Sequence, residues 1–587
     1  MILKALYDYY HRDRQSVPFG KQVASISFII VINKRGEFIR VEDSRTDKKG
    51  TNYLVPVGTH NNGISPLLFW DNVQYLLDYI PQSEPLSEKD AADKKKVDER
   101  ESKIKKSHEK HLAFVKRCQF VAEKTQQEEL LSVSYFYSNN ELRKVYNDPL
   151  WGEIKKNPLS WLSFRVEGSL NIVACNVFLR DFNNDSLQDS SKGICLITGN
   201  KANIARLCLP TPIPGAKSSA KLVAFNDSSF CSYGKEQGDN APISQEAEFA
   251  FSSALLKLKS EGSRNKFTIG NRTFLFWASK DDEAGKQSEE SIFNMFGFNE
   301  QEDDPNRNIE QVRKVFEAIN TGTLKTTSDD MFYILGLAPN SARIAVTYWA
   351  EIPLRQFAGT ICRHFNDMAL VDMRPEKKPY MSLRNIISAV TLGGKVSDAT
   401  PNLPESVVKS IFEGLPYPQT LFASCIRRIR AESGEKDKNP IFITRAAIIK
   451  AYLNRLNNNQ KPIEAMLDKE NSNQGYLCGR LFAVLDKIQE KANNQHSIRE
   501  RYMNSASSTP AAVFSTILNL SNHHMENLKN EGQKIYFEKL KQEIISKIEA
   551  GGFKAQLDLQ DQGRFFIGYY HQRQDFFLKN ESTENNE

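Results

Sequence analysis

Apolar and polar positions along the first half of the chain follow the patterns expected of strands and short helices. Residues 24–32 form a β-branched apolar run, Asn33-Lys34-Arg35-Gly36 has the composition of a turn, and residues 37–42 alternate again. This pattern predicts a β-hairpin, and residues 3–10 predict a short helix before it. Further strands are predicted at residues 169–180, 193–198, 221–225, 273–278 and 343–350.

Two polar stretches interrupt this pattern. Residues 84–110 carry 9 Lys/Arg and 8 Asp/Glu, so the charges nearly cancel. Such mixed charge is typical of a solvated helix, with a nucleic-acid contact as the alternative. Residues 280–308 are polar and contain Gly and Asp, which predicts an exposed loop or linker.

From about residue 404 the period of the pattern becomes helical. Apolar residues recur at helical spacing within 477–488, and Thr509-Pro510 has the composition of a helix start. Several helices joined by short loops must bury their apolar faces on one another, which predicts a bundle. The predicted fold class is therefore α+β, with a mixed N-terminal α+β region followed by a C-terminal α-helical bundle.

The composition is that of a globular protein without membrane spans. The 587 residues are 40% hydrophobic and 26% charged, and no apolar run is long enough to cross a bilayer. The first residues lack the pattern of a signal peptide, so we expect a cytoplasmic protein with its eight cysteines reduced. This length predicts several domains. We place an N-terminal α+β recognition region at residues 1–280, a linker with a mixed α/β continuation at residues 281–400, and the helical region at residues 401–587.

The most distinctive stretch is residues 210–243, in which small and amide residues crowd both ends of one short predicted strand. Small residues let backbone amides approach a phosphate, and lysines add positive charge. Amide side chains can present donors and acceptors to base edges. The alternative is a pair of ordered structural loops. The candidate nucleic-acid contacts here are Lys217, Lys221, Asn226, Lys235, Gln237 and Asn240.

Two other regions are candidates for the same chemistry. Asn61 and Asn62 precede Gly63 in a turn that can also offer amides to a DNA groove. Residues 421–455 hold eight basic and three acidic residues, a local charge of +5, although the whole chain is only +6. A basic face suits a phosphate backbone, and the alternative is an ordinary solvated helix. The candidate contacts of this span are Arg427, Arg428 and Arg430.

Catalytic and metal-binding patterns are scarce. The chain has no CxxC pair, no HExxH pattern, no GxSxG elbow and no Walker loop, and His523-His524 lies in an amphipathic helix. We therefore expect no enzymatic activity, no cofactor and no metal. A metal-dependent nuclease and a purely structural scaffold remain the alternatives.

Short motifs lie in order along nearly the whole chain, at residues 1–6, 63–66, 69–72, 196–199, 222–226, 232–237, 240–242, 333–343, 414–418, 479–485, 505–510, 562–563 and 568–572. Together they resemble the large subunit of the type I-C (Dvulg subtype) CRISPR Cascade. One departure is Leu207-Cys208-Leu209-Pro210, where the family pattern leads us to expect a histidine.

The resemblance implies a non-catalytic subunit that acts in antiviral defence. Such a subunit recognises the protospacer-adjacent motif in double-stranded target DNA, helps to open the duplex into an R-loop, and supports recruitment of a separate helicase-nuclease. Its partners would be the guide RNA complex and the backbone and small subunits of the same ribonucleoprotein. In such systems the protein reads the short motif while base pairing reads the sequence.

The resemblance also implies that the C-terminal helices correspond to the family's small subunit, which can be made separately from an internal start. Translation from Met466 would give a 122-residue product, residues 466–587. Translation from Met503 would remove the first helix of the predicted bundle.

Overall fold

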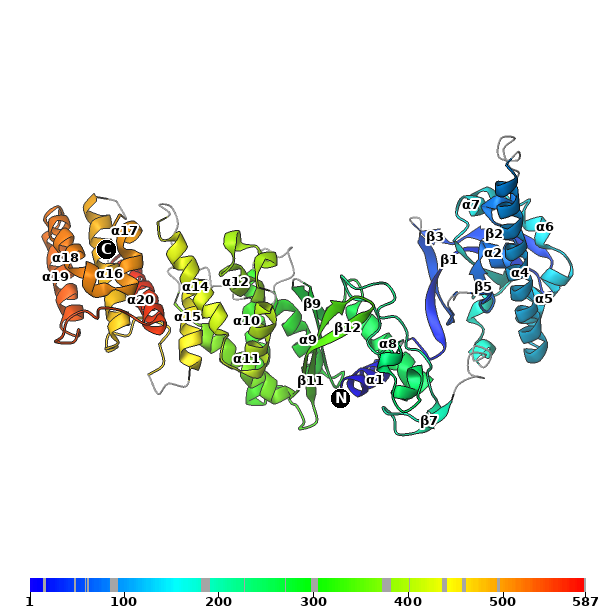
Figure 1. The fold of residues 1–587 in the computed structure, drawn as a ribbon, viewed down its shortest axis with the longest axis horizontal. Helices are drawn as coiled ribbons and strands as arrows, with labels where there is room; N and C mark the ends of the chain where they lie inside the picture. The colour runs from blue at the N-terminus through cyan, green and yellow to red at the C-terminus, as the bar shows by residue number, and fades with distance from the viewer. Residues whose placement is uncertain are drawn as a thin grey trace. The chain divides into compact units, whose positions relative to one another are not determined.

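A computed structural model of the chain divides it into two compact units (Figure 1). The larger unit contains residues 1–12, 210–222 and 255–587, and the smaller unit contains residues 13–209 and 223–254. The structure describes residues 1–13, 17–46, 49–58, 60, 63–84, 93–180, 191–225, 227–269, 271–296, 305–371, 382–400, 402–434, 441–456, 461–493 and 497–584.

The smaller unit is built on a mixed sheet with the strand order β3-β4-β1-β6-β5, in which β2 also pairs with β1. β1 is antiparallel to β2 and β4, and parallel to β6. The predicted hairpin is confirmed as the β1–β2 pair. The strands are β1 (Lys21–Ile32), β2 (Phe38–Asp43), β3 (Arg45–Thr46), β4 (Lys49–Pro56), β5 (Trp70–Asn72) and β6 (Trp161–Val166).

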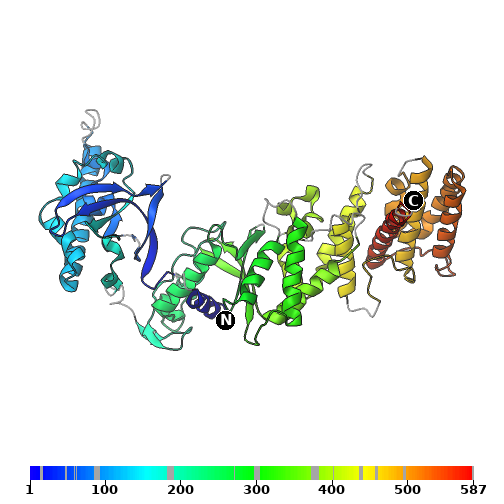
Figure 2. The same ribbon diagram turned by 180° about the vertical axis from the view of Figure 1, so that it is seen from behind.

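Helices cover this sheet, as Figure 2 shows for the blue strands and the cyan helices. The end of β1 from Phe28 to Ile32 is buried at every position, because helices pack on it and neighbouring strands flank it. Phe136 on α5 packs edge-on against Phe164 on β6, with ring centroids 5.4 Å apart. The helices of this part are α2 (Val73–Leu77), α4 (Lys94–Thr125), α5 (Glu128–Ser138), α6 (Leu142–Val145) and α7 (Trp151–Lys156).

Residues 191–209 and 223–254 form a small second part of the same unit. A two-stranded hairpin, β7–β8, is followed by two short 3₁₀ turns and the start of a helix. The backbone N–H of Ser244 donates to the thiol of Cys195, at 3.2 Å, which fastens the hairpin to that helix. The elements are β7 (Lys192–Ile194), β8 (Lys201–Asn203), η5 (Ser228–Phe230), η6 (Gln237–Asn240) and α8 (Gln245–Lys259).

The larger unit begins with a four-stranded antiparallel sheet in the order β12-β11-β10-β9. One face carries phenylalanines that pack on helices, such as Phe332 on Phe357 with centroids 4.5 Å apart. On the other face Trp277 packs against Tyr9 of the N-terminal helix α1, with centroids 6.2 Å apart. The elements are α1 (Ile2–Arg12), β9 (Lys266–Ile269), β10 (Arg272–Ala278), α9 (Glu283–Met295), α10 (Pro305–Thr321), β11 (Met331–Asn340), β12 (Arg343–Pro353) and α11 (Leu354–Met368).

The rest of the larger unit is helical, which confirms the predicted change after residue 404. α16 and α20 lie in close contact because glycines leave room: a Cβ on Gly479 would lie 1.9 Å from the carbonyl oxygen of Phe565. The helices are α12 (Leu383–Ser388), α13 (Leu403–Glu413), α14 (Gln419–Glu432), α15 (Ile443–Arg455), α16 (Gln474–Asn493), α17 (Ser497–Ser508), α18 (Pro510–Glu526), α19 (Glu531–Ile545) and α20 (Leu559–Glu584).

The α+β fold class is confirmed, but three local predictions are wrong. The predicted strand at 169–180 contains the 3₁₀ turns η2 (Val173–Cys175) and η3 (Val177–Arg180). The predicted strand at 221–225 is reduced to one bridge between Lys221 and Arg343. The predicted loop at 280–308 contains α9 and the start of α10, because buried Ile292 and Met295 give α9 an apolar face despite its polar composition.

Two further observations concern the cysteines and the apolar character of the helices. All eight cysteines are free thiols. Within the part of the chain that the structure describes, no helix combines the length and apolar character needed to span a bilayer.

The division into domains predicted at residues 280 and 400 stays a prediction, as does the identity of 466–587 as a separate functional segment.

Candidate nucleic-acid interface

The stretch 210–243, treated as one region in the sequence, is divided between the two units after Leu222. In the larger unit, Thr211 and Ala220 close a loop through a backbone hydrogen bond of 2.8 Å. Gly215 turns this loop with φ +82°, and a side chain there would crowd Pro339. Lys217 is anchored by its backbone N–H, which donates to the carbonyl oxygen of Ser341 at 3.1 Å.

This anchoring leaves the ammonium groups available. The side chain of Lys217 is exposed and that of Lys221 is half-buried, and neither forms an ion pair with a described residue. A fixed backbone with a free ammonium group is the arrangement that neutralises a phosphate at low entropic cost. The loop can therefore supply two positive charges to a polyanion.

The smaller unit holds Lys235, Gln237 and Asn240 in a loop that Asn240 organises. The Asn240 side chain accepts a hydrogen bond from the N–H of Ser232, at 3.0 Å. Its amide donates to the carbonyl oxygens of Lys235 and Gln237, at 3.3 and 3.1 Å. The amide of Asn240 is thus used within the loop, while the ammonium of Lys235 is exposed and has no ion-pair partner among the described residues.

Beside this loop lies a small pocket of about 200 Å³, lined in part by Gln237 and Arg206. Gly238 brings the loop against the segment that follows β8, since its N–H donates to the carbonyl oxygen of Arg206 at 3.0 Å. The Arg206 side chain is exposed and has no ion-pair partner among the described residues. An arginine and a glutamine side by side can contact guanine and adenine edges.

Arg206 was missed by sequence reasoning. It stands alone between apolar residues, 31 positions before Gln237, and no local charge pattern marks it. The long-range contact between Gly238 and Arg206 is what places it at the loop.

The remaining amide candidates, Asn61, Asn62 and Asn226, lie outside the described residues. Their neighbour His60 is described, and its Nε2 lies 2.7 Å from Oδ1 of the fully buried Asp71. The His60 ring also stacks on Tyr75, with centroids 4.6 Å apart. The hydrogen bond with Asp71 raises the pKa of His60. Burial raises the pKa of Asp71, although His60 acts in the opposite direction.

The arginines of α14 are less accessible than their sequence suggests. Arg427 is exposed, but the guanidinium of Arg428 pairs with Glu432 on the next turn of the helix. Burial lowers the pKa of Arg430, and its backbone carbonyl accepts a hydrogen bond from Asn504 at 3.1 Å.

Other basic residues of the 421–455 span are structural. Arg445 forms two hydrogen bonds with the Glu432 carboxylate, of 2.6 and 3.0 Å, and a third with the carbonyl oxygen of Ala389. Arg455 donates to Asp367 and to backbone carbonyls, and its side chain is only 1% exposed. The local +5 therefore does not form one surface patch among the described residues.

The described residues contain no group of three or more His, Cys, Asp or Glu side chains arranged to hold a metal ion. What the candidate residues offer is electrostatic and hydrogen-bonding chemistry: free lysines and one free arginine on loops with fixed backbones. These groups fit an anionic polymer.

The chain thus has an α+β fold with a helical C-terminal region, and its candidate residues carry free positive charges on anchored loops. Residues 6–577 match the family model described as CRISPR-associated protein (Cas_Csd1), and the chain belongs to this family. No curated protein matches the chain.

Proposed function

We propose that the chain is the non-catalytic large subunit of a type I-C CRISPR surveillance complex. In this role it recognises the protospacer-adjacent motif in double-stranded DNA and helps to open the duplex. The observation that carries the proposal is the family match over residues 6–577. The exposed ammonium groups of Lys217 and Lys235 supply positive charge for the phosphate backbone.

The motif would be recognised by the polar side chains beside the Asn240-organised loop. Gln237 and Arg206 lie at one pocket, so both can reach the same short segment of duplex. Lysines of the loops would hold phosphates and set the orientation, and base-edge contacts would provide specificity. A complex that has opened its target would then recruit a separate helicase-nuclease, within a cytoplasmic antiviral response.

The test compares the guide-loaded complex assembled with and without this chain on duplexes that carry or lack the adjacent motif. We expect motif-dependent binding and strand opening, read by permanganate reactivity of unpaired thymines, only when the chain is present. Equal opening without the chain would contradict the proposal. Incubation of the purified chain with DNA and Mg²⁺ or Mn²⁺ tests the nuclease alternative, and cleavage that a single carboxylate substitution abolishes would favour it.

We further propose that the helical C-terminus is also made as a small subunit from Met466. This residue is exposed and lies between α15 and α16, so a start there leaves α16–α20 intact. Met503 lies inside α17 and is fully buried, and a start there would remove α16. Gly563 of α20 packs against Phe422 and Ile449, so the separate product would expose this apolar face to a partner.

The hypothesis is tested by mass spectrometry of complexes from cells that carry Met466→Ala. We expect the short species to disappear while the full-length chain stays at its normal level. A short species of unchanged mass in the variant would exclude Met466 as the start.

A further inference from the structure

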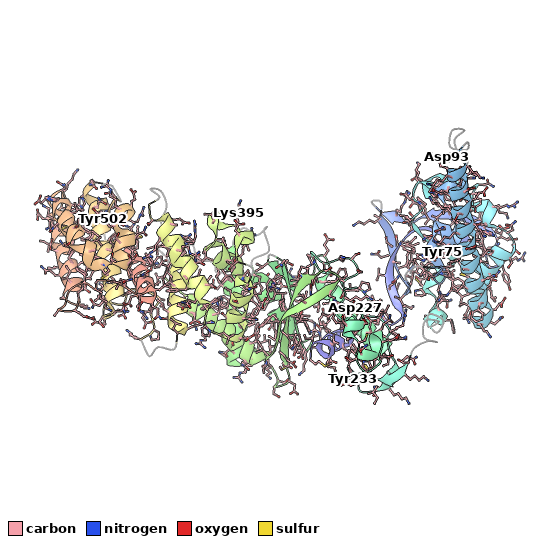
Figure 3. All side chains as sticks on the ribbon, viewed as in Figure 1. Tyr75, Asp93, Asp227, Tyr233, Lys395 and Tyr502 are labelled. Carbon is pink, nitrogen blue, oxygen red and sulfur yellow. The ribbon has the colours of Figure 1, made fainter. Side chains whose placement is uncertain are left out.

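The loop organised by Asn240 presents one aromatic side chain in an unusual way. Tyr233 is 99% exposed, which makes it the most exposed large apolar side chain among the described residues. Its φ is +55°, in the left-handed region that disfavours bulky residues. Figure 3 labels Tyr233 on this part of the smaller unit. A residue at once strained and fully exposed points to function rather than to packing.

The exposure of the Tyr233 side chain does not result from a loosely held loop. Besides the three hydrogen bonds of Asn240, the hydroxyl of Ser191 donates to Asp239 at 2.7 Å. A Cβ on Gly238 would lie 2.0 Å from the carbonyl oxygen of Ala205, so the loop lies directly against the segment that follows β8. The turn that carries Tyr233 is therefore held from both sides, and its backbone is fixed before any ligand arrives.

The surroundings of the ring indicate what it can bind. Its neighbours Ser232 and Gly234 are small, and no aromatic or cation–π contact involves Tyr233 among the described residues. Both faces of the ring are thus open to a flat partner. The exposed ammonium of Lys235, two residues further on, can hold an adjacent phosphate.

We propose that Tyr233 stacks on an unpaired nucleobase of a strand separated from the target DNA, an inference that rests on the proposed function. Stacking on aromatic side chains is the sequence-tolerant way in which proteins hold single strands. A ring placed beside a motif-reading loop captures a base as soon as its pair opens, which favours the separated state.

The test uses the complete complex with Tyr233→Gly, Tyr233→Trp and the control Leu170→Ser. Glycine relieves the backbone strain, so the first variant removes the ring without endangering the fold. Leu170 is 95% exposed in the same unit and serves as a matched surface change. Affinities are measured by fluorescence anisotropy on two targets. The paired target carries the motif but lacks the guide-complementary sequence, so it stays paired, and the bubble target has unpaired bases beside the motif.

We expect Tyr233→Gly to weaken binding of the bubble target by about 5- to 150-fold, the effect of losing one stacked base. Binding of the paired target should change less than about twofold, because stacking needs an unpaired base. Tyr233→Trp should retain the affinity, and Leu170→Ser should leave both targets unaffected. A 2-aminopurine placed in the bubble should lose its fluorescence quenching in the glycine variant alone.

An unchanged affinity for the bubble target, or equal losses on both targets, would overturn the inference. Loss of another protein subunit from the glycine complex would also overturn it, because the ring would then be a protein contact. Failure of the proposed function is distinguishable, since the wild-type complex would itself show no preference for motif-bearing DNA.

Discussion

The loops that carry Lys217 and Lys235 and the helices between residues 421 and 455 look alike as basic segments, but the structure uses their charges differently. In the loops the backbone is anchored and the ammonium groups remain exposed. In the helices, Arg445 and Arg455 are buried and bonded to carboxylates and carbonyl oxygens. The difference shows that the net charge of a segment does not tell how many of its charged groups are accessible to a ligand.

The largest expected effect comes from removing a buried arginine of the helical region. Arg445→Ala would leave Glu432 without its main partner, and Arg445 is the first cause that lowers the pKa of that carboxyl. We expect a loss of about 2–3 kcal/mol in the free energy of unfolding, because the hydrogen bonds of a buried guanidinium to Glu432 and Ala389 are removed while Arg428 still pairs with that carboxylate. Urea unfolding followed by circular dichroism measures it.

Arg427→Ala, on the exposed side of α14, is the control, and it should change stability by no more than about 0.5 kcal/mol. Similar losses in the two variants would mean that the Arg445 pair does not stabilise the fold.

The loop lysines should show the opposite behaviour. Changing Lys217, Lys221 and Lys235 together to Ala should leave stability nearly unchanged and weaken target binding in a salt-dependent way. The slope of log K against log salt should fall by up to about 2.7, at about 0.9 for each lost phosphate contact. A filter-binding titration from low to high salt measures this slope.

Lys314, Lys529 and Lys539, which are exposed in the larger unit and lie outside the candidate stretches, provide a matched control triple. An identical slope in wild type and in the loop variant would remove the loop lysines from the interface.

A smaller effect should distinguish base recognition by Gln237 from the structural role of Asn240 in the same loop. Gln237→Ala should reduce discrimination between the correct and an incorrect adjacent motif by about 1–3 kcal/mol if this amide contacts a base. Asn240→Ala should instead weaken binding to both motifs, because its amide holds the loop together. Competition binding with the two duplexes gives the ratio, and identical behaviour of the two variants would contradict the distinction.

The smallest effect concerns a charged pair that is partly exposed. Because the pKa of His60 is raised above 6.5, its protonation stabilises the fold below pH 6.5, and this stabilisation is lost as the pH rises through the raised value. The groups that face His60 are Asp71 on β5, Tyr75 on α2 and Lys110 on α4, and the effect of Lys110 opposes that of Asp71.

We therefore expect the melting temperature to fall above pH 6.5 in wild type, and to fall less in His60→Gln. Differential scanning fluorimetry across this range measures both proteins. Parallel curves would show that the pair makes no pH-dependent contribution.

Much of the architecture was predictable because it depends on local patterns. The turn Asn33–Gly36 between a β-branched run and an alternating run was sufficient to predict the β1–β2 hairpin, and Thr509-Pro510 marked the start of α18. The strand predicted at 169–180 was wrong because a β-branched run does not distinguish a strand from successive 3₁₀ turns. For the candidate site, the sequence predicted which types of residue take part but not which of them lie together.

The sequence by itself determined the α+β class, the change to helices after residue 404, and the motif pattern of a CRISPR-associated family. Only the tertiary structure decided that Arg206 lies beside Gln237, that the 210–243 stretch is shared by two units, and that Arg445 is buried. The physical reason is that exposure depends on partners distant in the chain. A guanidinium is available to DNA only where folding brings no carboxylate or carbonyl oxygen against it.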